Sequence, residues 1–173
     1  ILVSLLQFAR PSVLKVEIVD PRELIEGVLP LFEKRANEAN IDIIKNFSAL
    51  QMRLSVDKNQ IHQVIFNIIK NAMEAMPDGG KITIKTYKMV VPELSYSNPS
   101  CVIELHDTGS GISKENILKI AEPFFSTKER VAGTGLGLFM VKSILDKHKG
   151  KLLVASETGR GTLMKIVLPI VKD

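Results

Sequence analysis

The chain has 173 residues, 45% of them hydrophobic, which is enough for one well-packed domain and short for two. Its net charge of +4 is spread along the sequence and its aromatic residues are seven Phe and two Tyr, so nucleic-acid binding is not expected as its main task. Anionic small ligands such as nucleotides remain compatible. The single cysteine, Cys101, excludes an internal disulfide framework and fits a reducing compartment, and its apolar surroundings indicate a small core residue.

No apolar run approaches the roughly 18 residues that a membrane-spanning helix needs, and the first residues show neither a basic leader nor a small-residue cleavage site. We therefore expect a cytoplasmic domain, and membrane anchoring of the full-length protein is left open. The sequence does not begin with Met, which suggests a piece of a longer protein.

The first predicted elements are a helix end and a strand. Residues 1–9 resemble the last turns of a helix that Arg10 and Pro11 end, and its apolar side would need a partner helix that this chain does not supply. Residues 13–19 alternate between two sets of side chains, which predicts a strand.

A helix is predicted next, because Asp20 and Pro21 form a typical start for one that runs to about residue 39. Short strands are expected at 41–47 and 52–56. The residues expected on the inner side of the helix are Leu24, Ile25, Val28, Leu31, Phe32 and Ala36.

Residues 57–76 form the most regular predicted helix, since their apolar residues recur at three- and four-residue steps. Asp57 is the expected N-cap, and residues 77–80 end the helix in a turn. Asn67 and Asn71 are four residues apart on the polar face, so their amides lie on one side. Asparagine is a mediocre helix former, so the pair indicates a function. A solvated polar face is the alternative.

The second half of the chain is predicted to alternate strands with one long helix. In chain order we expect a strand at 81–90, a polar loop at 92–99, a strand at 100–106, a helix at 135–149 and a hairpin of 151–156 with 162–168. This order predicts an α+β fold: a two-layer sandwich whose mixed, mostly antiparallel sheet is covered on one face by helices.

Two glycine-rich stretches have the chemistry of a nucleotide site. Asp107 ends a strand and is followed by Gly109 and Gly111, so its carboxylate could accept a hydrogen bond from the exocyclic amine of a base, although an ordinary turn has the same pattern. Residues 133–138 open the last long helix, where glycines let backbone N–H groups approach phosphate oxygens. Leu138 excludes the usual dinucleotide fingerprint.

Between these stretches lies a loop at residues 122–132. Two Phe residues beside Pro123 can anchor it, its tip is polar, and Lys128 and Arg130 could reach a phosphate tail. A solvated surface loop is the alternative for this stretch taken alone.

Five sequence boxes in order closely resemble the catalytic ATP-binding domain of bacterial sensor histidine kinases, within the gyrase–histidine kinase–MutL superfamily that shares the Bergerat fold. The details resemble the nitrogen-regulation and sporulation-kinase branch. The boxes cover about residues 57–169, and they are the asparagine box 67–72, the glycine boxes 107–111, 133–137 and 159–162, and the phenylalanine box 123–128.

The resemblance implies ATP and Mg²⁺ as cofactors and assigns roles to matching positions. Asn71 would be the Mg²⁺ ligand, and Asp107 would bind adenine. Asn67 stands where related ATPases have a glutamate that activates water, and an amide cannot act as that base. The expected catalytic residues are Asn67, Asn71 and Lys128. The expected ATP-binding residues are Asn67, Lys70, Asn71, Asp107, Gly109, Gly111, Ile112, Phe124, Lys128, Arg130, Gly133, Thr134, Gly135, Leu136, Gly137, Leu138 and Thr162.

The sequence departs from the family pattern in two ways. Glu74 stands where many relatives have a lysine, which shifts phosphate contact to Lys128 and Arg130. The acceptor histidine segment is also absent, since His62, His106 and His148 are expected to be structural or surface residues.

Residues 1–11 resemble the end of the family's dimerising phosphoacceptor hairpin, which leaves 12–173 as the catalytic ATP-binding domain. The implied function is transfer of the ATP γ-phosphoryl group to a histidine on that hairpin. The implied partners are the hairpin domain of the same homodimeric protein and a response regulator. A serine kinase of the anti-sigma type and a non-catalytic nucleotide-sensing module are the alternatives, whereas Asn67 argues against an ATPase.

Overall fold

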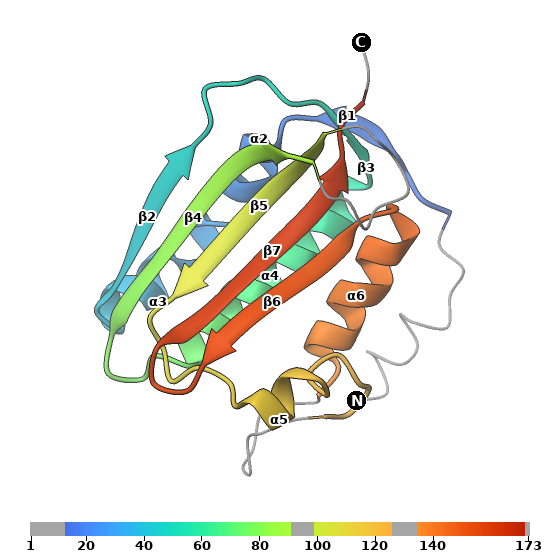
Figure 1. Cartoon of the computed structure of the whole chain (residues 1–173). Coiled ribbons are helices and arrows are strands. Elements are labelled where there is room, and N and C mark those ends of the chain that lie inside the picture. Colours follow the sequence, from blue (N-terminus) through green and yellow to red (C-terminus); the bar gives the residue numbers. More distant parts are fainter. Residues whose placement is uncertain (1–12, 91–98, 126–134, 172–173) are drawn as a thin grey trace.

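The computed structural model describes residues 13–90, 99–125 and 135–171 (Figure 1). Its strands are β1 (Glu17–Val19), β2 (Ile41–Phe47), β3 (Leu54–Val56), β4 (Gly80–Met89), β5 (Ser100–Asp107), β6 (Lys151–Glu157) and β7 (Gly161–Pro169). Its helices are α2 (Pro21–Glu26), α3 (Pro30–Glu38), α4 (Lys58–Glu74), α5 (Lys114–Ile117) and α6 (Gly137–Lys147).

The main sheet has five strands in the order β2-β4-β5-β7-β6. β2 and β4 run parallel, whereas every other pair in this sheet is antiparallel. β1 and β3 form a separate antiparallel pair. Figure 1 shows α4 behind the strands of the main sheet, with α6 packed beside α4 and next to β6. The predicted two-layer α+β sandwich with a mostly antiparallel sheet is therefore confirmed.

α4 is the central element of the helical layer. Asp57 caps it as predicted, because its Oδ1 accepts a hydrogen bond from the Gln60 N–H at 3.2 Å. The apolar stripe packs into the core between the sheet and the neighbouring helices, so the polar stripe is left on the opposite side. The buried residues of α4 are Ile61, Val64, Ile65, Ile68, Ile69, Ala72 and Met73.

The predicted single helix from residue 21 to 39 is wrong, since the structure has two helices there, α2 and α3. Pro30 explains the break: it has no N–H, and within a continuous helix its ring would clash with the carbonyl of Glu26. The break also turns Leu31 outward, where it is 69% exposed, while Leu29 is buried. Leu31 was therefore wrongly predicted to face inward.

Two predicted strands are shorter in the structure. The strand expected at 13–19 begins only at Glu17, and the strand expected at 52–56 begins at Leu54.

Cys101 is fully buried as predicted, and burial raises the pKa of its thiol to about 12, which keeps it protonated at neutral pH. Among the described residues, no helix is both long and apolar enough to cross a membrane.

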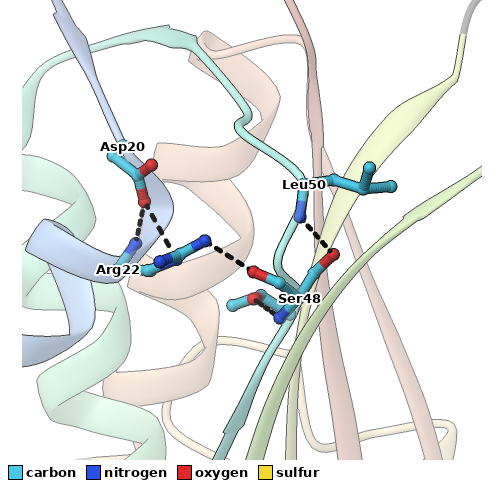
Figure 2. Close-up of polar contacts among 5 residues, drawn as sticks. Asp20, Arg22, Ser48 and Leu50 are labelled. Atoms are coloured by element: carbon cyan, nitrogen blue, oxygen red, sulfur yellow. Dashed lines mark hydrogen bonds and ion pairs between the residues drawn. The ribbon is translucent and has the colours of Figure 1, made fainter.

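A polar contact holds the start of α2 to the connection after β2 (Figure 2). Asp20 Oδ1 accepts from the Arg22 N–H at 2.7 Å, and Arg22 Nη2 donates to the Ser48 carbonyl at 2.7 Å. The Ser48 N–H donates to Thr86 Oγ1 on β4 at 3.0 Å. Thr86 pairs with Ile103, whereas Asp107 lies at the far end of β5, so this contact stands away from the candidate site.

Candidate functional site

Asp107 is the buried acid at the centre of the site. It ends β5, it is 6% exposed, and its Oδ1 accepts hydrogen bonds from the Gly109 N–H at 2.9 Å and the Thr162 N–H at 3.1 Å. Burial raises the pKa of this carboxyl, and the two N–H donors act in the opposite direction. Two separate backbone segments therefore fix the orientation of the carboxylate.

A row of polar side chains crosses the sheet at this level. Asp107 on β5 is paired with Thr162 on β7, and Thr162 is paired with Ser156 on β6. Ser156 Oγ lies 2.9 Å from Thr162 Oγ1, accepts from the Ile112 N–H at 2.8 Å and donates to the Gly161 carbonyl at 2.8 Å. Thr162 was expected in the site, whereas Ser156 was not.

The segment after Asp107 is held between two other parts of the chain. The Ser110 N–H donates to the Ala75 carbonyl at the end of α4 at 3.1 Å, and the Gly159 N–H in the turn between β6 and β7 donates to the Ser110 carbonyl at 2.7 Å. Gly161 packs so closely that a Cβ built on it would lie 2.0 Å from the Asp107 carbonyl oxygen, and its φ is +88°. Only glycine fits there without a backbone shift. The first and third glycine boxes are thus in direct contact, as the site requires.

The polar side of α4 carries Asn67, Lys70 and Asn71, all of them partly buried. Lys70 Nζ lies 3.8 Å from Glu74 Oε1, an i,i+4 ion pair with side-chain exposures of 40% and 21%. Glu74 therefore takes up part of the charge that Lys70 was expected to offer to phosphates.

The start of α6 lies beside this polar side. A Cβ built on Gly137 would be 3.7 Å from Asn67 Oδ1, so the end of the second glycine box and the asparagine box are neighbours. Leu136 is buried and Leu138 packs against the core, so these two side chains contribute to packing.

Phe124 and Gly135 lie on either side of residues 126–134, which are outside the described residues. Phe124 is 63% exposed with φ +65°, and a Cβ on Gly135 would be 2.4 Å from the Phe124 carbonyl carbon, so the two backbones are in contact. Four expected site residues, Lys128, Arg130, Gly133 and Thr134, lie outside the described residues.

The three histidines occupy different settings, and none lies in this row. His148 Nε2 accepts from the Asp57 N–H at 3.0 Å, and its Nδ1 is 2.8 Å from the Ile144 carbonyl, so it ties the end of α6 to the start of α4. Burial lowers the pKa of His62, and His106 is exposed. His148 is therefore a structural residue and His106 a surface residue, as expected, whereas the role of His62 stays a prediction.

Asn71 is the residue expected to bind a metal. Its side-chain carbonyl oxygen suits Mg²⁺, which prefers oxygen ligands and usually keeps few protein ligands beside water and phosphate. In the described ranges, no group of three or more His, Cys, Asp or Glu could hold a metal ion.

Comparison with known proteins assigns the family. Residues 56–172 match the family described as histidine kinase-, DNA gyrase B- and HSP90-like ATPase. The chain belongs to this ATPase family. It is 38% identical to sporulation kinase C of Bacillus subtilis over 174 residues, which cover all of this chain and 38% of that protein. It is 34% identical over 167 residues to the signal transduction histidine-protein kinase AtoS of Escherichia coli, covering 96% of this chain and 26% of AtoS.

Solved structures place this family member among histidine kinase catalytic domains. The catalytic domain of histidine kinase ThkA, in a nucleotide-free form, superposes with a TM-score of 0.76 at 31% identity and covers 90% of this chain and 95% of that one. ThkA in complex with the response regulator protein TrrA gives 0.79 at 27% identity over 98% of this chain and 46% of that one. The predicted family and fold are confirmed. The chain spans 38%, 22% and 26% of the length of sporulation kinases C, E and A of Bacillus subtilis.

Proposed function

We propose that this chain is the ATP-binding catalytic domain of a two-component sensor histidine kinase. It would transfer the γ-phosphoryl group of ATP to a histidine on a helical dimerisation domain. Residues 1–11 would be the end of that domain's hairpin and the linker to the catalytic domain. A response regulator would receive the signal downstream, and the full-length protein would act as a homodimer with this domain in the cytoplasm. The single observation that carries this proposal is the buried Asp107, which the Gly109 and Thr162 N–H groups hold in place, in a segment that is hydrogen-bonded to the end of α4 through Ser110 and Ala75.

The base would bind at the row formed by Asp107 and Thr162. Because Oδ1 of Asp107 already accepts hydrogen bonds from two backbone N–H groups, Oδ2 is the oxygen that can accept one from the exocyclic amine of adenine. Gly109, Gly111 and Ile112 would lie beside the base, and the hydrogen bond from the Ile112 N–H to Ser156 Oγ would hold this backbone segment in position. The site thereby matches a nucleotide whose base donates hydrogen bonds.

The phosphates would lie between α4 and the start of α6. Backbone N–H groups at Gly135, Gly137 and Leu138 and the positive end of the α6 dipole would favour them, together with Lys70 and, from the loop, Lys128 and Arg130. Asn71 would hold Mg²⁺, which would neutralise charge on the phosphates during transfer. Asn67 lies beside Gly137, and its amide could not act as the general base that activates water for attack on ATP. This favours phosphoryl transfer over hydrolysis.

The test compares two substitutions on this face of α4. Asn71→Ala should abolish magnesium-dependent tightening of nucleotide binding, because the metal loses its amide ligand. Asn67→Glu should retain nucleotide binding and release more free phosphate, because a carboxylate can act as a base where the amide cannot. Titration calorimetry with and without Mg²⁺, and a free-phosphate assay, measure these effects. Unchanged magnesium dependence in Asn71→Ala would contradict the assignment of the metal ligand.

A further inference from the structure

The hydroxyl of Ser156 makes three polar contacts, and counting protons fixes the direction of each one. The Ile112 N–H can only donate, so it occupies one lone pair of Ser156 Oγ at 2.8 Å. The Gly161 carbonyl can only accept, so it takes the single hydroxyl proton of Ser156 at 2.8 Å. Ser156 therefore has one lone pair left for its remaining neighbour.

That neighbour is Thr162 Oγ1, 2.9 Å away, where either oxygen could in principle be the donor. Because Ser156 has no proton left, Thr162 must donate its own hydroxyl proton to Ser156. The lone pairs of Thr162 Oγ1 then remain, and this buried hydroxyl can act toward a ligand only as an acceptor. Thr162 is 4% exposed and its N–H is bound to Asp107, which leaves it little freedom to rearrange.

We propose that Ser156 is a specificity-determining positioning residue, which selects a base that carries an exocyclic amine over one that carries a carbonyl at the same place. This inference rests on the proposed function, because it concerns the base that the Asp107 row binds. With Ser156 in place, the carboxylate of Asp107 and the hydroxyl of Thr162 are both acceptors and match the amine of adenine. The O6 carbonyl of guanine would meet two acceptors without a donor, which is unfavourable in a buried site.

Loss of the Ser156 hydroxyl would change the polarity of Thr162. In Ser156→Ala the Thr162 hydroxyl proton has no fixed partner, so the hydroxyl can rotate and donate to a carbonyl on the base. A guanine nucleotide would then regain a hydrogen bond that the parent protein denies it. A purely structural role for Ser156, as a link between β6 and the segment ending at Ile112, would instead weaken both nucleotides alike.

The experiment measures dissociation constants for ADP and GDP by titration calorimetry and follows their ratio. Ser156→Ala should reduce the preference for ADP about tenfold. Ser156→Thr, which keeps the hydroxyl, should retain the preference, and Ser55→Ala on the exposed surface of β3 is the control for a serine change away from the row. Thr162→Val removes the acceptor and should also reduce the preference.

The double variant decides whether Ser156 acts through Thr162. In a Thr162→Val background, Ser156→Ala should leave the ADP-to-GDP ratio unchanged. If Ser156→Ala weakens ADP and GDP by equal factors, or if Thr162→Val keeps the full preference, the inference is overturned while the proposed function stands. If Ser156→Ala does not fold, a Thr162→Val variant that keeps the full preference for ADP still overturns the inference. A parent protein that binds neither nucleotide would overturn the proposed function itself, and the inference with it.

Discussion

The substitution Asp107→Asn tests the base site with almost no change in shape. In the parent protein Oδ1 accepts from the Gly109 N–H at 2.9 Å and from the Thr162 N–H at 3.1 Å. An asparagine must place its carbonyl oxygen there, since an NH₂ group would face two donors. Its NH₂ therefore takes the position of Oδ2, and an acceptor for the adenine amine becomes a donor that opposes it.

The magnitude follows from the burial of this residue, which is 6% exposed. Leaving a buried polar group without its partner costs about 1–3 kcal/mol, so the dissociation constant for ADP should rise about 5- to 150-fold. The substitution should not lower the free energy of unfolding at neutral pH, because of the direction in which the pKa of Asp107 is shifted. Burial raises the pKa of Asp107, so the folded state binds this proton more tightly than the unfolded state, and the charge disfavours folding as pH rises through the folded-state pKa.

Titration with a fluorescent ADP analogue measures the affinity, and thermal unfolding without nucleotide provides the control for folding. We expect a weaker ligand and a melting temperature at neutral pH that is equal to or above that of the parent. Equal affinity of Asp107→Asn and the parent would refute the assignment of Asp107 to the base. A large fall in melting temperature would refute the argument from the pKa.

Two further predictions follow from the same end of the sheet. Because the pKa of Asp107 is raised above its usual value of 3.8, carbon-13 NMR of its carboxyl should show a titration midpoint above 3.8 without nucleotide and a lower midpoint with ADP bound. The affinity for ADP should therefore rise as pH increases through the pKa of the nucleotide-free protein. Identical midpoints in the two states would contradict this. Gly159 and Gly161 have φ values of +78° and +88°, but a Cβ on Gly159 meets nothing within 4 Å whereas one on Gly161 would overlap the Asp107 carbonyl. Gly159→Ala should therefore lower the free energy of unfolding by about 1–2 kcal/mol, from backbone strain alone, and Gly161→Ala by clearly more; equal losses in urea denaturation would show that the close contact is unimportant.

The parts of the site that could be predicted are those whose signal is local in sequence. Asn67 and Asn71 were found because two poor helix formers recur four residues apart in an otherwise regular helix. Asp107 was found because an acid followed by glycines ends an apolar strand. In each case one element carries the whole pattern, so neighbouring residues suffice.

Other features depend on contacts between distant segments. Ser156 is an ordinary strand residue in the sequence, and its importance arises only when Ile112, Gly161 and Thr162 are brought around its hydroxyl. The His148 contact with the Asp57 N–H likewise joins residues 91 positions apart. No local sequence pattern predicts contacts between residues so far apart in the chain.

Two further features do have a local signal in the sequence. Pro30 inside a predicted helix indicates a break, and weighing it would have separated α2 from α3 and placed Leu31 outside. Lys70 and Glu74 have the i,i+4 spacing of a helical ion pair, which could have been predicted from the sequence.

Phosphotransfer to a separately supplied hairpin tests the central claim most directly. The chain is incubated with γ-labelled ATP and Mg²⁺, alone and with a helical hairpin that contains an acceptor histidine, and the label is followed onto each protein and into free phosphate. We expect acid-labile label on the hairpin and none on this chain, at a low rate because the encounter has become bimolecular. Asn71→Ala should abolish the transfer. Acid-stable label on the isolated chain would indicate serine phosphorylation and would contradict the account.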